Sequence, residues 1–152
     1  MNLLLDTNIL LAVVRSKDYE GIVNFLNPNN GLIYVSVASE AEIKSIALRS
    51  GWGSQRKEKL DNFLDAIITV ELNQLYINSY IEIDAYSQRS HPNFKHYPFR
   101  TPRNMGKNDL WIASLAALLG LKLITTDADF DHLDKIFFEV QKVKMEDFLP
   151  FL

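Results

Sequence analysis

Short apolar runs alternate with segments of helical spacing along this chain, and that alternation constrains its fold more than any other feature. Strands are expected over residues 3–5, 32–35, 67–72, 121–126 and 136–140. Helices are expected over residues 7–15, 18–27, 37–51, 54–66, 73–90 and 109–119. Because strands that alternate with helices form a parallel sheet covered on both faces, the sequence predicts an α/β fold. The expected architecture is a three-layer α/β/α sandwich around a parallel sheet of about five strands.

Capping residues predict where several of these helices begin and end. Thr7 or Asn8 can cap the first helix, and Ser36 is a candidate N-cap for the third. Asn108 is expected to cap the last helix, which Gly120 then closes.

Size and composition predict one domain over residues 1–152. With 152 residues, 47% of them hydrophobic, the chain can bury a substantial core but is short for two domains. The absence of cysteine excludes disulfides, thiolate nucleophiles and zinc–thiolate sites. No run reaches the roughly 18 apolar residues that a membrane span needs, and the N-terminal run lacks a basic leader. We therefore expect a soluble cytoplasmic protein without a membrane span.

Four separated acids stand where apolar stretches start or stop: Asp6, Glu42, Asp109 and Asp127. Asp6 and Asp127 directly follow expected strands, and ligands of open parallel sheets bind at the carboxyl ends of the strands. Glu42 and Asp109 lie early in helices that could point back over the same edge. Clustered carboxylates repel one another unless a cation compensates, and all-oxygen ligands favour Mg²⁺ or Mn²⁺.

Each acid also has a plainer interpretation when it is taken alone. Asp6 could help to start a helix, Asp109 could act on a helix dipole, and Glu42 could be solvated like Glu40. The alternation of acids over residues 127–131 suggests a calcium loop, but the sixth position of such a loop would be His132 instead of glycine. The joint placement of the acids at strand ends favours a shared site.

The four acids lie in the motifs LLLDTNILL, VSVASEAEI, GKNDLWIASLA and LITTDADF. On these motifs, the chain resembles the PIN-domain ribonucleases, and among them the VapC-type toxins of toxin–antitoxin pairs. LLLDTNILL is similar to the family's opening strand, and VSVASEAEI matches its serine followed six residues later by a glutamate. GKNDLWIASLA matches the helix that bears the third acid, and LITTDADF matches the final T-x-D-x-D-F. The resemblance covers residues 1 to about 140.

The resemblance implies an endoribonuclease that depends on one or two Mg²⁺ or Mn²⁺ ions. Its metal-binding and catalytic residues would be those at the matching positions, Asp6, Glu42, Asp109 and Asp127. The resemblance further implies supporting roles for Asn8 and Thr125 and an auxiliary role for the acid Asp129. Thr126 departs from the pattern, because many relatives have a basic residue there.

In the mechanism that we expect, Asp6 and Asp127 bind the principal ion, while Glu42 and Asp109 complete the site or orient the attacking water. The resemblance also implies an antitoxin that binds near the acidic cleft, and a homodimer. The apolar tail at residues 148–152 could pack on the domain or contact such a partner.

Two basic segments stand out from a chain whose net charge is −3. Residues 44–59 carry five cations against one acid, and we regard Arg49, Arg56 and Lys57 there as a weaker candidate surface for RNA. Residues 91–105 contain three prolines and no apolar period, which predicts a long loop. The cations in and around that loop are candidates for RNA binding: Arg89, Lys95, Arg100, Arg103 and Lys107.

Aromatic residues lie between these loop cations, at positions 86, 94, 97 and 99. They could stack on the bases of single-stranded RNA, or they could pack on the core of an ordinary solvated loop. Trp52 and Trp111 are interpreted as core or interface aromatics, and His132 as structural.

Two other functions stay open. A catalytically inactive PIN-like module could bind RNA or a protein partner. A receiver-like or phosphoryl-transfer protein could use an aspartyl phosphate, but the chain lacks the lysine after the last strand that a receiver needs.

Overall fold

Five parallel strands form one sheet in the computed structural model, which describes residues 1–152. The strands stand in the order β3-β2-β1-β4-β5. Their bounds are β1 Leu3–Leu5, β2 Ile33–Ser36, β3 Ile68–Val70, β4 Lys122–Thr125 and β5 Val140–Lys142. Leu4 of the central strand pairs with Tyr34 on one side and Leu123 on the other. The predicted α/β fold with a parallel sheet of five strands is confirmed.

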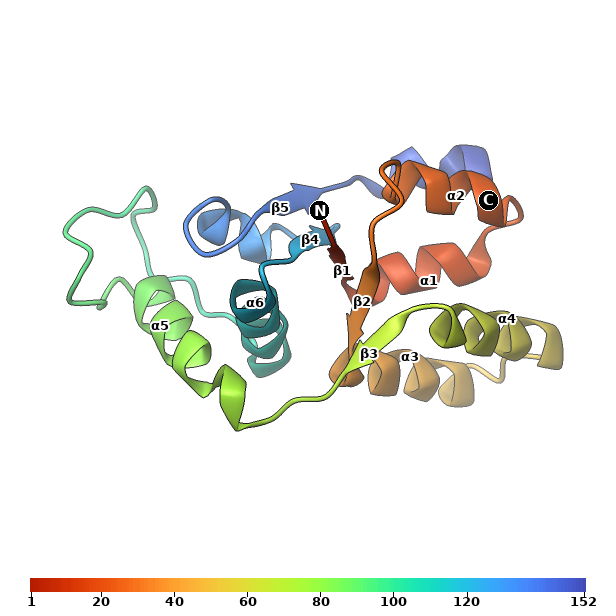
Figure 1. Ribbon diagram of the computed structural model, residues 1–152, viewed down its shortest axis with the longest axis horizontal. Coiled ribbons are helices and arrows are strands. Elements are labelled where there is room, and N and C mark those ends of the chain that lie inside the picture. Colours follow the sequence, from red (N-terminus) through yellow and green to blue (C-terminus); the bar gives the residue numbers. More distant parts are fainter.

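Helices cover both faces of this sheet (Figure 1). One layer contains α1 Thr7–Arg15, α2 Tyr19–Leu26, α3 Val37–Arg49 and α4 Ser54–Asp65. The other layer contains α5 Ile77–Ser87 and α6 Lys107–Leu119. Short 3-10 helices span Gln74–Tyr76 (η1), Ala128–Leu133 (η2) and Met145–Phe151 (η3). None of the helices combines the length and the apolar composition that crossing a membrane requires.

The side chains of the central strand alternate between two hydrophobic clusters. Leu3 and Leu5 face the cluster under α1 to α4, whereas Leu4 faces the cluster under α5 and α6. Burial on both faces explains why β1 is apolar at every position. Trp52 is buried in the first cluster and Trp111 packs against the second, which agrees with their interpretation as core aromatics.

Two predicted helix caps are wrong. Asp6 is the N-cap of α1, because its Oδ1 accepts a hydrogen bond from the backbone N–H of Thr7 at 2.8 Å. At α6 the N-cap is Gly106, and Asn108 already belongs to the first turn. Ser36 caps α3 and Gly120 ends α6 in the left-handed conformation, as predicted.

The last strand and the start of α5 also differ from the prediction. The expected strand at residues 136–140 begins only at Val140, because the preceding residues form a turn. Lys135 has φ +62° and its backbone N–H bonds the carbonyl of Phe138, so this segment cannot lie alongside β4. The helix expected from residue 73 starts as a 3-10 turn, and α5 itself begins at Ile77.

Candidate metal centre

The carboxyl edge of the sheet gathers the acids that the sequence singles out. Asp6 directly follows β1 and Asp127 lies just beyond β4, and these two strands are neighbours in the sheet. Asp109 lies in the first turn of α6, and Glu42 lies on α3 after β2. Asp129 follows in η2.

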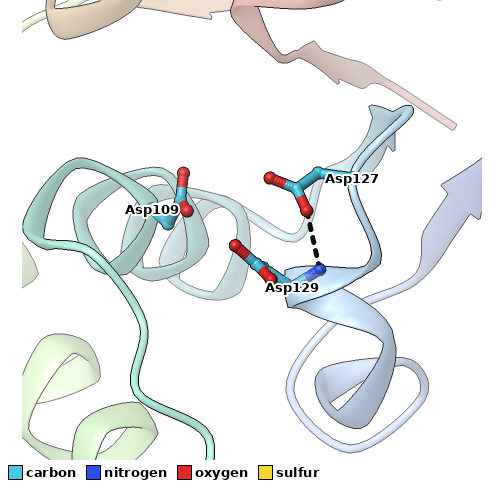
Figure 2. A group of neighbouring side chains, drawn as sticks. All are labelled: Asp109, Asp127 and Asp129. Carbon is cyan, nitrogen blue, oxygen red and sulfur yellow. Dashed lines mark hydrogen bonds between the residues drawn. The ribbon is translucent and has the colours of Figure 1, made fainter.

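Three carboxylates approach one another most closely. One oxygen from each of Asp109, Asp127 and Asp129 lies within 4.8 Å of the other two. In Figure 2 these side chains converge from α6, from the end of β4 and from η2. Asp127 Oδ1 accepts a hydrogen bond from the backbone N–H of Asp129 at 2.9 Å, which fixes the turn between them. Asp129, expected only as an auxiliary acid, therefore belongs to the close group together with Asp109 and Asp127, whereas Asp6, expected to bind the principal ion, is not part of that group of three.

Asp6 is held beside this group by a buried threonine. Thr125 Oγ1 donates to Asp6 Oδ2 at 2.7 Å and accepts from the backbone N–H of Asp127 at 3.0 Å. Thr125 is fully buried and Asp6 is 7% exposed. One hydroxyl thus fixes the acids of two neighbouring strands relative to each other.

Glu42 reaches the site through a residue that the sequence analysis missed. Thr7 Oγ1 donates to Glu42 Oε2 at 2.9 Å, while Glu40 instead pairs with Lys44 on the outer face of α3. The available signal was a polar residue in the first turn of a buried helix, directly after Asp6. Asn8 is exposed and donates to Thr126 at 3.4 Å, and it has no hydrogen bond to any of the acids.

The acids raise one another's affinity for protons. Burial, with the charges of Asp6, Asp127, Asp129 and Glu42 in addition, raises the pKa of Asp109 to about 6. Burial also raises the pKa of Asp6, against the opposing effect of its hydrogen bonds to Thr125 and Thr7. Burial and the neighbouring negative charges thus both disfavour the ionised form of Asp109, and a positive charge close by would offset them.

No basic side chain forms an ion pair with these acids. The ion pairs of the protein join Lys44 to Glu40, His91 to Glu82, and Lys142 to Asp131, so none includes an acid of the site. The donor set is entirely oxygen and comes from several elements, which fits a hard divalent cation such as Mg²⁺ or Mn²⁺.

The aromatic residues of the long loop pack inward. Tyr86 on α5 is buried, and the rings of Phe94, Tyr97 and Phe99 surround it at centroid distances of 4.7, 5.2 and 5.4 Å. These rings belong to the second hydrophobic cluster, so the structure favours the packing interpretation over base stacking. The candidate cations Arg89, Lys95, Arg100 and Lys107 are exposed.

Arg103 is the loop cation that the structure brings to the acids. A polar pocket of about 250 Å³ is lined by residues 101–105 together with Asp129. Arg103 lines this pocket, and its Nε atom is buried without a hydrogen-bond partner. Arg103 therefore shares a pocket with one acid of the group, Asp129, whereas Arg89 lies over the ring of Tyr97, with its guanidinium carbon 5.5 Å from the ring centroid.

His132 connects η2 to α5. Its Nε2 lies 2.7 Å from Ser87 Oγ, and its ring is stacked parallel to Tyr86. Burial, with the nearby charge of Arg103, lowers the pKa of His132 to about 4. The residue is 6% exposed, in agreement with the structural interpretation from the sequence.

Comparisons with known proteins agree with this architecture. A family model described as PIN domain matches residues 3–136. No curated protein sequence matches the chain.

Several solved structures have a similar fold. VapBC2 from Rickettsia felis, bound to a DNA fragment from its promoter, aligns with a TM-score of 0.72 and 22% identity, over 93% of this chain and 98% of that chain. VapBC-1 from nontypeable Haemophilus influenzae aligns with a TM-score of 0.69 and 22% identity, over the same shares. A toxin–antitoxin complex from Klebsiella pneumoniae aligns with a TM-score of 0.65 and 15% identity, over 94% and 99%.

Proposed function

The chain belongs to the PIN domain family, and we propose that it is a divalent-metal-dependent endoribonuclease that serves as the toxin of a toxin–antitoxin pair. The observation that carries this proposal is the convergence of acids from separate elements without a basic partner. Asp109, Asp127 and Asp129 would hold one or two Mg²⁺ or Mn²⁺ ions, with Asp6 and Glu42 beside them. When bound, such an ion would supply positive charge to a phosphodiester and make water a better nucleophile.

The residues of the chain would orient the reaction. Thr125 and Thr7 hold the carboxylates of Asp6 and Glu42 in fixed directions, so these acids need little reorganisation when substrate arrives. A bound cation would counter the charges of the neighbouring acids, which together with burial raise the pKa of Asp109 in the metal-free protein.

The acids alone would repel an RNA backbone, so cations must hold the strand beside them. Arg103 supports this role best, because it lines the pocket that Asp129 shares. Exposed cations nearby, Arg89, Lys95, Arg100 and Lys107, would add a nonspecific attraction that depends on salt.

An antitoxin partner and a homodimer complete the proposal. The similar structure from Klebsiella pneumoniae is described as a toxin–antitoxin complex, and an antitoxin that covered the acidic edge of this chain would block access of RNA. Both partners would meet RNA in the cytoplasm.

The test is cleavage of RNA by the purified protein with Mg²⁺, with Mn²⁺ and with EDTA. Asp127→Asn should reduce the cleavage rate at least 100-fold, because it removes a charged oxygen donor from the site. Asp131→Asn is the matched control, since Asp131 lies in the same turn but pairs with Lys142 at the surface. Equal rates in EDTA and in Mg²⁺ would contradict the proposal, and RNA binding without any cleavage would assign an inactive RNA-binding module instead.

A further inference from the structure

A basic hollow lies at the C-terminal end of α1, on a side of the domain away from the acidic edge. It measures about 200 Å³. Cationic side chains dominate its lining, which contains Arg15, Lys17, Arg56 and Lys59. No acidic residue lines it, so the hollow is positively charged, whereas the candidate metal centre is negatively charged.

These cations come from separate segments that the fold brings together. Arg15 is the last residue of α1 and Lys17 follows it, whereas Arg56 and Lys59 lie in the first turns of α4. None of them takes part in an ion pair of the protein. Four uncompensated charges around one hollow repel one another, and a bound anion would relieve that repulsion.

Two of the cations are held in place by the protein itself. Lys59 Nζ donates a hydrogen bond to the backbone carbonyl of Ser16, which joins α4 to the end of α1. The guanidinium of Arg56 lies over the ring of Trp52, with its carbon 5.2 Å from the ring centroid. Because Trp52 is buried, this contact fixes the side chain at little additional entropic cost. Arg15 and Lys17 are exposed and free to move toward a ligand.

The placement of the hollow relative to the acids indicates what kind of anion it would bind. Asp6 caps the start of α1, and Arg15 ends that helix of nine residues. At 1.5 Å per residue the two ends lie about 14 Å apart. A stacked strand advances roughly 3.4 Å per nucleotide, so about four nucleotides cover this distance.

The basic loop lies at the other end of the molecule. In Figure 1 the loop that follows α5 extends at the left, while the end of α1 and the start of α4 lie at the right. The acidic edge, at the starts of α1 and α6, lies between them. A polyanion that crossed this edge would therefore find positive charge on both sides of it.

We propose that the hollow is a distal phosphate site, which binds the backbone of an RNA strand about four nucleotides from the phosphodiester at the acids. The proposal rests on the proposed ribonuclease function. It makes RNA length a determinant of affinity, because only a strand longer than about four nucleotides can contact both places.

The experiment measures binding by fluorescence anisotropy in EDTA, where no metal-dependent cleavage occurs. Two labelled single-stranded RNAs are compared. One, of about 4 nucleotides, is too short to reach from the acids to the hollow and contact both, and the other, of about 16 nucleotides, is long enough. The double variant Arg15→Gln, Lys17→Gln should bind the long RNA at least tenfold more weakly than the wild type at low salt. The slope of log affinity against log salt should fall by about 1.4, as expected for the loss of two phosphate contacts. The affinity for the short RNA should fall less, because a short strand cannot contact the hollow and the acidic edge at the same time.

The matched control is the double variant Lys122→Gln, Lys135→Gln, which removes the same charge far from the hollow along the chain. An equal loss of long-RNA affinity in this control would overturn the proposal, as would an unchanged affinity in the Arg15 and Lys17 variant. Polyglutamate, added at the same concentration of negative charges as the RNA, serves as a competitor. If it displaced the long RNA from the wild type, the hollow would be assigned to an acidic protein segment instead.

Cleavage with Mg²⁺ is assayed separately, so that the two proposals can fail independently. Cleavage without the length effect would overturn only the distal site. The length effect without cleavage would overturn only the nuclease.

Discussion

At the scale of single residues, one hydroxyl connects the acids of two strands. Thr125 Oγ1 donates a hydrogen bond to Asp6 and accepts one from the backbone N–H of Asp127, and the residue is fully buried. The position of both carboxylates therefore depends on a side chain that carries no charge.

Thr125→Val should destabilise the protein by about 1–3 kcal/mol, because it leaves a buried carboxylate oxygen and a backbone N–H without their partner. It should also raise the pKa of Asp6 further, since the hydrogen bond from Thr125 lowers it. Urea unfolding at pH 7.5 measures the first effect. Thr125→Ser keeps the hydroxyl and should stay within about 1 kcal/mol of wild type; equal losses in both variants would show that volume, and not the hydroxyl, matters.

The ionised carboxylate of Asp109 should lower the free energy of unfolding of the metal-free protein at neutral pH. Its pKa is about 6 when folded and 3.8 as the reference value, so its contribution to stability is complete below pH 3.8 and is lost as pH rises through 6. Asp109→Asn should therefore raise the free energy of unfolding by about 1–2 kcal/mol at pH 7.5, a figure reduced for partial exposure, and by less at pH 4. Thermal unfolding in EDTA tests this. Mg²⁺ should stabilise the wild type more than the variant, and the reverse order would contradict a cation site at Asp109.

At the scale of elements, most strands and helices could be predicted because their signals are local. The buried run at β1, the Ser36 cap and the Gly120 stop all act through neighbouring residues. The late start of β5 could not be predicted, because it depends on the left-handed Lys135 and on a bond from the Val140 N–H to the side chain of Asp134.

The residues of the candidate metal centre also divide into those that could be predicted from local sequence and those that could not. Asp6 and Asp127 were predictable as strand-end acids, since neighbouring parallel strands end at one edge. That Asp129 turns back into the group depends on the hydrogen bond from its backbone N–H to the side chain of Asp127, the N-cap of η2. Likewise, the inward packing of the loop aromatics depends on Tyr86, which lies on a different element.

The contact between η2 and α5 predicts a pH dependence. His132 has a pKa of about 4 when folded against 6.5 as the reference value, so the unfolded state binds more protons between these values. The contribution of His132 to the free energy of unfolding is therefore complete above pH 6.5 and is lost as the pH falls toward 4. Compared with His132→Gln, the wild type should lose about 1–2 kcal/mol more between pH 7 and pH 4.5, measured by urea unfolding. His96→Gln, at an exposed position, is the control and should unfold in parallel with the wild type.

At the scale of the whole molecule, the C-terminal tail completes the first layer of helices. Phe148 is fully buried in the cluster that contains Leu3 and Leu5, and its ring meets that of Phe25 on α2 edge to face at 6.0 Å. The backbone carbonyl of Phe151 accepts hydrogen bonds from Lys17 and Asp18. The tail thus packs on its own domain, as one of the two sequence interpretations expected.

Phe148→Ala should consequently cost about 3–5 kcal/mol of stability, because it leaves a cavity between the sheet and α2 that the surrounding helices cannot fill. Leu149→Ala tests the neighbouring side chain, which is 65% exposed, and should change stability by less than about 0.5 kcal/mol. Chemical unfolding of both variants at pH 7.5 separates the buried from the exposed face of η3. A Phe148→Ala protein as stable as the wild type would contradict the packing of the tail, whereas a marked loss in Leu149→Ala would show that the exposed face is covered in solution, as an interface with a second copy would require.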